Sequence, residues 1–101
     1  DVRGSTNGVE INNEIWFLCH VVSYEERRFY YHMFIVLDKD TFKIKRATRM
    51  FTFNGQRVEY TLGFCYFEKE DTLLIGYSEM DSNHNYCFVK KNTIENMMNN
   101  Y

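Results

Sequence analysis

The sequence predicts an all-β protein of antiparallel strands that ends in one short helix. Apolar residues recur with a period of two along most of the chain, which is the spacing of a strand and not of a helix. Aromatic residues make up 18% of the 101 residues, and such side chains are enriched in strands. Proline, which interrupts sheet hydrogen bonding, is absent.

Seven segments have the composition and alternation of strands. They are 14–22, 28–38, 41–45, 49–53, 57–67, 72–78 and 85–90. Alternation within 41–45 predicts that Phe42 and Ile44 point inward and that Lys43 and Lys45 face water. The pair Asn54-Gly55 predicts a tight turn, because both residues tolerate positive φ.

The C-terminus has the pattern of a short helix. Asn92 is a suitable N-cap and Glu95 follows it by three residues, as in a capping box. Ile94, Met97 and Met98 form a short apolar stripe.

The segments 14–22 and 28–38 are apolar on both faces, and such strands need cover above and below their sheet. We therefore expect this sheet to lie between two other layers. A chain of this length cannot supply all of that cover, so it is expected to be a segment of a longer protein or to self-associate. The first residue, Asp1, is also consistent with an excised segment.

Charge, apolar runs and cysteine spacing argue against several classes of function. The formal net charge is −2, so the basic surface of a non-specific nucleic-acid-binding protein is missing. No apolar run reaches the roughly 18 residues that span a membrane. Cys19, Cys65 and Cys87 are isolated, which fits buried free thiols rather than disulfides or a metal site. We expect no cofactor, no metal ion, no nucleic-acid partner, no membrane partner and a cytoplasmic location.

The chain contains an internal repeat. Glu14–His20 resembles Asp71–Tyr77, and His32–Val36 resembles Asn85–Val89. Arg3 and Glu59 hold similar places ahead of the two units, which are expected to span 1–56 and 57–101. A repeat of 50–57 residues with about four short strands suits the blade of a β-propeller. Chance similarity between antiparallel hairpins is the alternative.

These segments resemble the last part of a five-bladed β-propeller of the mannosyl-glycan phosphorylase family and its glycosyltransferase-associated relatives. The similar stretches follow the family's order: Arg3–Thr6, Trp16–His20, Arg28–Asp38, Val58–Tyr60 with Gly63, and Leu74–Asp81. The chain departs from the family at Ser5, which stands in place of a second glycine, and at Val21, which replaces the glycine after His20.

The resemblance implies a site for a glycan or a sugar phosphate at the propeller axis. In it, Arg3 and His20 would hold phosphate, while carboxylates and an aromatic ring would hold sugar. Five residues are the candidates for substrate binding: Arg3, His20, Glu59, Tyr77 and Asp81. The family's catalytic acid lies in an earlier blade, so no catalytic residue is expected here. The full-length relative would be a glycoside phosphorylase or hydrolase.

Each candidate has a structural alternative. Arg3 could be a solvated terminal arginine, His20 a hydrogen-bonded core histidine, and Asp81 a turn residue. His32 is expected to be a core residue. For the whole chain, the alternative is a non-catalytic protein-interaction module that self-associates or packs on a partner chain.

Overall fold

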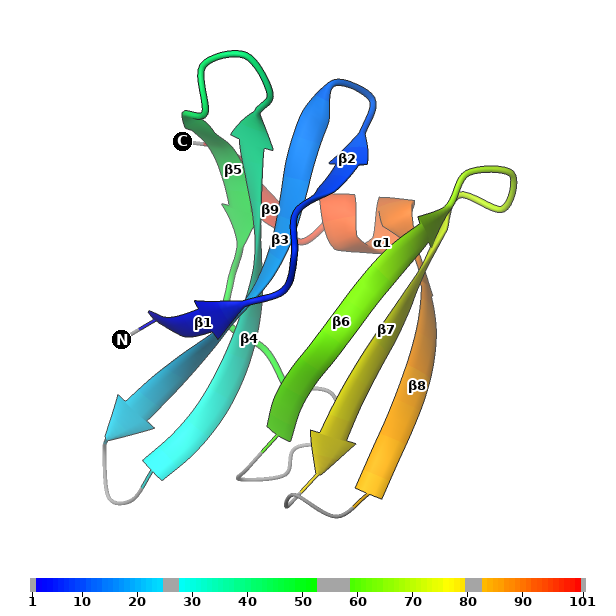
Figure 1. The fold of residues 1–101 in the computed structure, drawn as a ribbon. Helices are drawn as coiled ribbons and strands as arrows, with labels where there is room; N and C mark the ends of the chain where they lie inside the picture. Colours follow the sequence, from blue (N-terminus) through cyan, green and yellow to red (C-terminus); the bar gives the residue numbers. More distant parts are fainter. Residues whose placement is uncertain (1, 25–27, 53–58, 80–82, 101) are drawn as a thin grey trace.

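The computed structural model describes residues 2–24, 28–52, 59–79 and 83–100. They form two antiparallel sheets that lie face to face, with one short helix at one end (Figure 1). The all-β fold and the short C-terminal helix are therefore confirmed. The two sheets do not close into a ring, and the five-bladed propeller stays a prediction.

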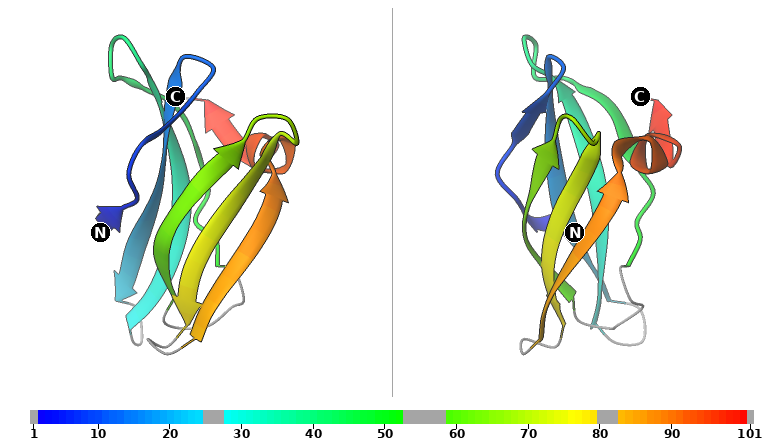
Figure 2. Two further views of the ribbon diagram at one scale, coloured as in Figure 1. Left: turned by 45° about the vertical axis from the view of Figure 1, so that its right-hand side comes forward. Right: turned by 90° about the vertical axis from the view of Figure 1, so that its right-hand side faces the viewer.

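The first sheet is formed mainly by the first half of the chain. Its order is β1 (Val2–Ser5), β3 (Glu14–Tyr24), β4 (Arg28–Asp38), β5 (Ile44–Thr48) and β9 (Met98–Asn100), and β2 (Val9–Ile11) also pairs with β3. The last strand, β9, therefore comes back from the end of the chain to pair with β5. Figure 2 shows this return past the helix.

The second sheet is a three-stranded meander. Its strands are β6 (Glu59–Phe67), β7 (Thr72–Glu79) and β8 (Asn83–Lys90), in that order. The helix α1 (Lys91–Glu95) follows directly and leads into β9. Its N-cap is Lys90, without a side-chain cap, and not the predicted Asn92. Met98, which the apolar stripe placed on the helix, belongs to β9.

The core lies between the sheets. It contains fully or almost fully buried side chains from both sheets and from α1: Ile11, Trp16, Leu18, Phe34, Val36, Leu73, Ile75 and Ile94. Phe34 is its centre, because it packs edge-on to Trp16 at 6.0 Å and to Phe64 of the second sheet at 5.6 Å between ring centroids. Edge-to-face packing of this kind suits the aromatic quadrupole.

Of two strand predictions between residues 39 and 53, one is partly right and one fails. In 41–45, Ile44 and Lys45 begin β5, but residues 41–43 belong to the connection after β4, where the Asp38 carboxylate accepts hydrogen bonds from the backbone N–H groups of Asp40 and Thr41. Phe42 has φ 60° and is 66% exposed, and Ile44 is also exposed, so the inward placing of both was wrong. In 49–53 the described part makes one bridge, between Phe51 and His32. The Asn54-Gly55 turn lies outside the described residues.

The internal repeat is reproduced in the pairing of the strands. His20 pairs with His32, and the repeat-related Tyr77 pairs with Asn85. Burial repeats as well, because Trp16 and Leu18 are fully buried and so are their counterparts Leu73 and Ile75. The two sheets therefore pack against each other through equivalent faces.

Candidate functional site

The structure places Arg3 and His20 on neighbouring strands of the first sheet. Arg3 lies in β1, an edge strand, and the next residue, Gly4, pairs with His20 of β3. His20 is half-buried and lies on the same face of the sheet as Trp16 and Leu18. The two residues that the resemblance assigns to phosphate therefore lie one register step apart.

Glu59 and Tyr77 are similarly placed in the second sheet. Glu59 begins the edge strand β6, and Tyr77 pairs with Thr61, two residues further along that strand. The Tyr77 ring is buried, at 5% exposure. Asp81 lies outside the described residues. The candidates thus form two pairs, one in each sheet, and a substrate-binding role for them stays a prediction.

His32 is a core residue, as expected. Its side chain is fully buried, and its ring lies 6.0 Å from the ring of Phe51. The backbones of the two residues exchange two hydrogen bonds, of 2.7 and 2.8 Å. These bonds hold the segment after β5 against β4.

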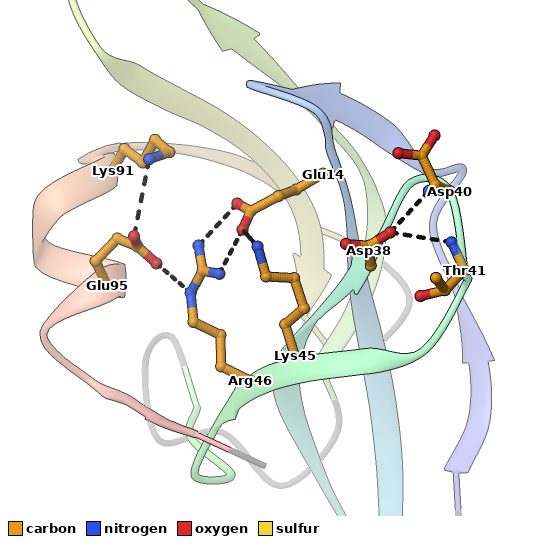
Figure 3. A network of polar contacts seen from close by, with 8 residues as sticks. All are labelled: Glu14, Asp38, Asp40, Thr41, Lys45, Arg46, Lys91 and Glu95. Carbon is orange, nitrogen blue, oxygen red and sulfur yellow. Dashed lines mark hydrogen bonds and ion pairs between the residues drawn. The ribbon is translucent and has the colours of Figure 1, made fainter.

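An ion cluster that the sequence analysis did not find lies at the end of the core next to α1 (Figure 3). Glu14 of β3 accepts two hydrogen bonds from the Arg46 guanidinium, at 2.6 and 2.9 Å, and one from Lys45 at 2.6 Å. Arg46 also donates to Glu95 of α1 at 2.8 Å, and Lys91 lies 3.9 Å from the same carboxylate. The cluster ties β3, β5 and α1 together.

The cluster covers the indole ring of Trp16. The Arg46 guanidinium lies 5.7 Å and the Lys91 ammonium 5.3 Å from the ring centroid. Cations over an aromatic face are stabilised by its quadrupole. Lys45 was expected to face water, and its side chain is 43% exposed while it pairs with Glu14. Arg46 is mostly buried, and β5, which carries both residues, is paired on both sides.

The charges of the ion cluster suit a structural role, holding strands together, rather than proton transfer. The hydrogen bonds from Arg46, with smaller contributions from Lys45, lower the pKa of Glu14 from 4.5 to about 2, although burial acts in the opposite direction. The hydrogen bond to Glu14 is also the main cause that raises the pKa of Arg46. Both groups therefore stay charged near neutral pH, where a general acid or base would need to exchange a proton.

The outer face of the second sheet is apolar and exposed. Tyr86 and Phe88 of β8 are 70% and 67% exposed, and Phe67 of β6 is 42% exposed. Leu74 lies between β6 and β8 on the same face, since it pairs with Cys65 on one side and with Phe88 on the other. The sequence signal for this surface was the alternation in β8, in which Tyr86, Phe88 and Lys90 share one face.

Two shallow hollows lie on this face. One, of about 320 Å³, is lined by Gly63, Phe64, Cys65, Leu74, Gly76 and Tyr86. The other, of about 440 Å³, is lined by Phe67, Glu70, Thr72, Phe88 and Lys90. Gly63 and Gly76 pair with each other, so the floor of the first hollow is partly bare backbone.

Among the described residues, no group of three or more His, Cys, Asp or Glu side chains is arranged to hold a metal ion. No helix in the described part of the chain is long and apolar enough to cross a membrane. The comparisons with protein-family models, with curated proteins and with solved structures found no match to the chain.

Proposed function

We propose that the chain is a sheet-packing interaction module, and that the outer face of β6–β8 docks on another β-sheet. The observation that carries this proposal is the exposure of Tyr86 and Phe88 side by side around Leu74. The residues of this outer face are Gly63, Cys65, Phe67, Thr72, Leu74, Gly76, Tyr86, Phe88 and Lys90.

The shape of the face supports a sheet as its partner. The small residues Gly63, Cys65 and Gly76 lie on β6 and β7, and the most exposed rings, Tyr86 and Phe88, lie on β8. The Phe67 and Phe88 rings lie 6.5 Å apart between centroids, and a shallow hollow lies on the face near each end of β7. Stacked sheets interdigitate side chains at about 10 Å separation, so the hollows suit side chains of a second sheet.

Cys65 was expected to be buried, but its thiol is exposed on this face because it lies on the outer side of β6, whereas Cys19 is buried as expected. The reactivity of Cys65 therefore reports whether the face is covered. We expect N-ethylmaleimide to modify Cys65 rapidly in the dilute isolated chain and several-fold more slowly in cells that make the protein. The Cys65-to-Cys87 labelling ratio, measured by mass spectrometry, cancels differences in reagent concentration. Cys19 is the slow internal control, since it is buried and burial raises the pKa of its thiol. An equal ratio in cells and in the dilute chain would contradict the proposal.

A carbohydrate-handling propeller segment is the second candidate. The equivalent placing of His20 and Tyr77 favours it, because each lies beside the edge strand that begins its unit. In a propeller, the first strand of each blade lines the axis, and Arg3 and Glu59 would then face a shared pocket. The supporting experiment is binding of glycans or sugar phosphates by the full open reading frame, with loss of binding in Arg3→Ala and His20→Ala.

The contact between the sheets separates the two candidates. Blades of a ring are related by rotation about one axis, so each packs one face on the opposite face of its neighbour. Here Phe34 and Phe64 meet across equivalent faces, with 5.6 Å between ring centroids. A nuclear Overhauser effect between these two rings in the full-length protein favours the packing module. Its absence, with the strand pairing intact, favours the propeller.

A further inference from the structure

We infer that the partner of the β6–β8 outer face is the same face of a second copy of the chain, in a two-fold dimer whose axis runs parallel to β7. The inference rests on the proposed packing function and names the occupant of that surface. Two features of the face support it: the arrangement of small and large side chains in rows, and the glycine hollow, which is the hollow lined by Gly63 and Gly76.

Strand pairing arranges the face in three rows, each with one residue from β6, β7 and β8. The rows are Gly63, Gly76 and Tyr86, then Cys65, Leu74 and Phe88, then Phe67, Thr72 and Lys90. In the first two rows the small residue lies on β6 and the large, exposed ring on β8. In these two rows the side chains protrude little from the sheet at β6 and protrude further at β8.

A two-fold axis parallel to β7 uses this asymmetry. It lays β8 of each copy over β6 of the other and matches every row with itself. Tyr86 then lies over the partner's Gly63, and Phe88 lies over the partner's Cys65. An axis perpendicular to the strands would stack β8 on β8 and place Phe88 on its own counterpart. Because a two-fold interface must be self-complementary, the parallel axis is favoured.

The glycine hollow is suited to receive the ring. It measures about 320 Å³, and a Cβ added at Gly63 would meet no atom within 4 Å. The chain's own Tyr86 ring lies over Gly76, where an added Cβ would meet it at 3.5 Å, so the partner's tyrosine would cover the backbone of Gly63 beside it. Tyrosine is enriched at interfaces because it buries a large rigid surface and keeps a polar tip.

The opposite end of the face carries Lys90 and Glu70, which line the second hollow and are both exposed. Within one chain the Lys90 ammonium donates a hydrogen bond of 2.8 Å to the carbonyl oxygen of Glu70, so the two charged residues lie side by side in the monomer and do not select a register.

The size of the face predicts a weak dimer. Three strands of about eight residues cover roughly 400 Å², from strand spacings of about 4.8 Å and rises of about 3.3 Å per residue. Stable interfaces bury about 800 Å² per partner. The chain is thus expected to be mostly monomeric at about 5 µM and mostly dimeric at several hundred µM, corresponding to a dissociation constant on the order of 10–100 µM.

Sedimentation velocity of the whole chain over this concentration range tests the dimer. Gly63→Leu places a side chain in the glycine hollow without disturbing the packing of the monomer. This variant is expected to stay monomeric at every concentration. Phe88→Asp is expected to do the same, while Phe42→Asp is its matched control, because Phe42 is equally exposed but lies on the turn after β4. Circular dichroism and urea unfolding verify that each variant folds. A monomeric wild-type chain at all concentrations overturns the inference.

Cross-linking tests the axis. In a Cys87→Ser background, Phe88→Cys places a new thiol opposite the partner's Cys65. Diamide oxidises the two thiols to one disulfide and is itself reduced to the hydrazine. The same two thiols within one chain lie two strands apart, about 9.6 Å, and disulfides need Cα separations below about 7 Å. Peptide mapping is expected to find the new thiol bonded to Cys65 of the partner. A bond between the two new thiols, or no covalent dimer, overturns the proposed axis.

Failure of the dimer is distinguishable from failure of the packing function. If the chain is monomeric but Cys65 is protected in cells, another sheet covers the face. If Cys65 is also unprotected in cells, both proposals fail.

Discussion

The outer faces of the two sheets differ, although the sheets share one repeat. On the first sheet, the segment before β2 passes over the outer face so closely that a Cβ at Gly8 would lie 2.7 Å from Ile15 and 2.9 Å from Phe17. On the second sheet, a Cβ at Gly63 would meet nothing within 4 Å, and Tyr86 and Phe88 are exposed. The chain covers part of one outer face with its own connecting segment and leaves the outer face of β6–β8 exposed.

The inner faces of the two sheets, in contrast to the outer faces, are similar. They are alike in burial and pack together through Phe34 and Phe64, and the ion cluster closes this core at the α1 end. The stability of the monomer should therefore depend on the inner faces, while the outer face of β6–β8 should contribute to association.

The largest expected effect is that of truncating a ring on an inner face. Phe34→Ala removes a fully buried ring that contacts Trp16 and Phe64, and should lower the free energy of unfolding by about 3–5 kcal/mol. Phe88→Ala, its counterpart on the outer face, should change it by less than about 0.5 kcal/mol. Urea unfolding at low micromolar concentration measures both. Equal losses would remove the distinction between inner and outer faces.

A smaller, pH-dependent effect is expected at the ion cluster. Glu14→Gln should cost on the order of 2 kcal/mol at neutral pH, allowing for solvent screening, because Arg46 and Lys45 lose their shared carboxylate. The folded-state pKa of about 2 lies below the ordinary 4.5, so this stabilisation is complete above about pH 4.5 and is lost as the pH falls towards 2.

The matched control for Glu14 is Glu10, whose carboxylate pairs with Lys39 at 2.9 Å on the surface. Glu10→Gln should change the free energy of unfolding by less than about 0.5 kcal/mol and leave its pH dependence nearly unchanged. Thermal unfolding of the three proteins between pH 2 and 7 makes the comparison. A Glu14→Gln curve parallel to that of the wild type would show that the ion cluster is not a source of acid sensitivity.

The smallest effects on the free energy of unfolding are expected from adding one methyl group to each outer face. Gly8→Ala should destabilise the chain by about 1 kcal/mol, because the β-branched Ile15 cannot easily move away. Gly63→Ala should stabilise it by about 0.4–1 kcal/mol, since the methyl group enters open space and the unfolded chain loses freedom. Denaturation midpoints of the two variants should move in opposite directions; a shift of both in the same direction contradicts the difference in cover.

Much of the local structure could be predicted from the sequence. The long apolar runs of β3 and β4 and the alternation in β8 identified these strands within a few residues of their ends. The repeat predicted that His20 and Tyr77 hold equivalent positions, and the strand pairing reproduces this. The prediction for 41–45 was only partly right. Ile44 and Lys45 belong to β5, but the Asp38 carboxylate accepts hydrogen bonds from the backbone N–H groups of Asp40 and Thr41 and holds the residues before β5 in a turn.

The candidate site could be predicted only in part. The family resemblance grouped Arg3 with His20, and the β1–β3 pairing of the structure places them on neighbouring strands. Nothing in the sequence indicated that Glu14 would meet Arg46, or that Arg46 would meet Glu95. These three residues come from β3, β5 and α1, and only the return of β9 to β5 brings α1 to that place.

The sequence by itself determined the strands, the all-β class and which residues of a strand share a face, because a period of two follows from the local geometry of an extended backbone. The tertiary structure decided which of the two apolar faces is buried, where the last strand pairs and which charges meet. Those outcomes depend on the path of the connecting segments, which brings together residues such as Glu14 and Arg46 that lie 32 positions apart.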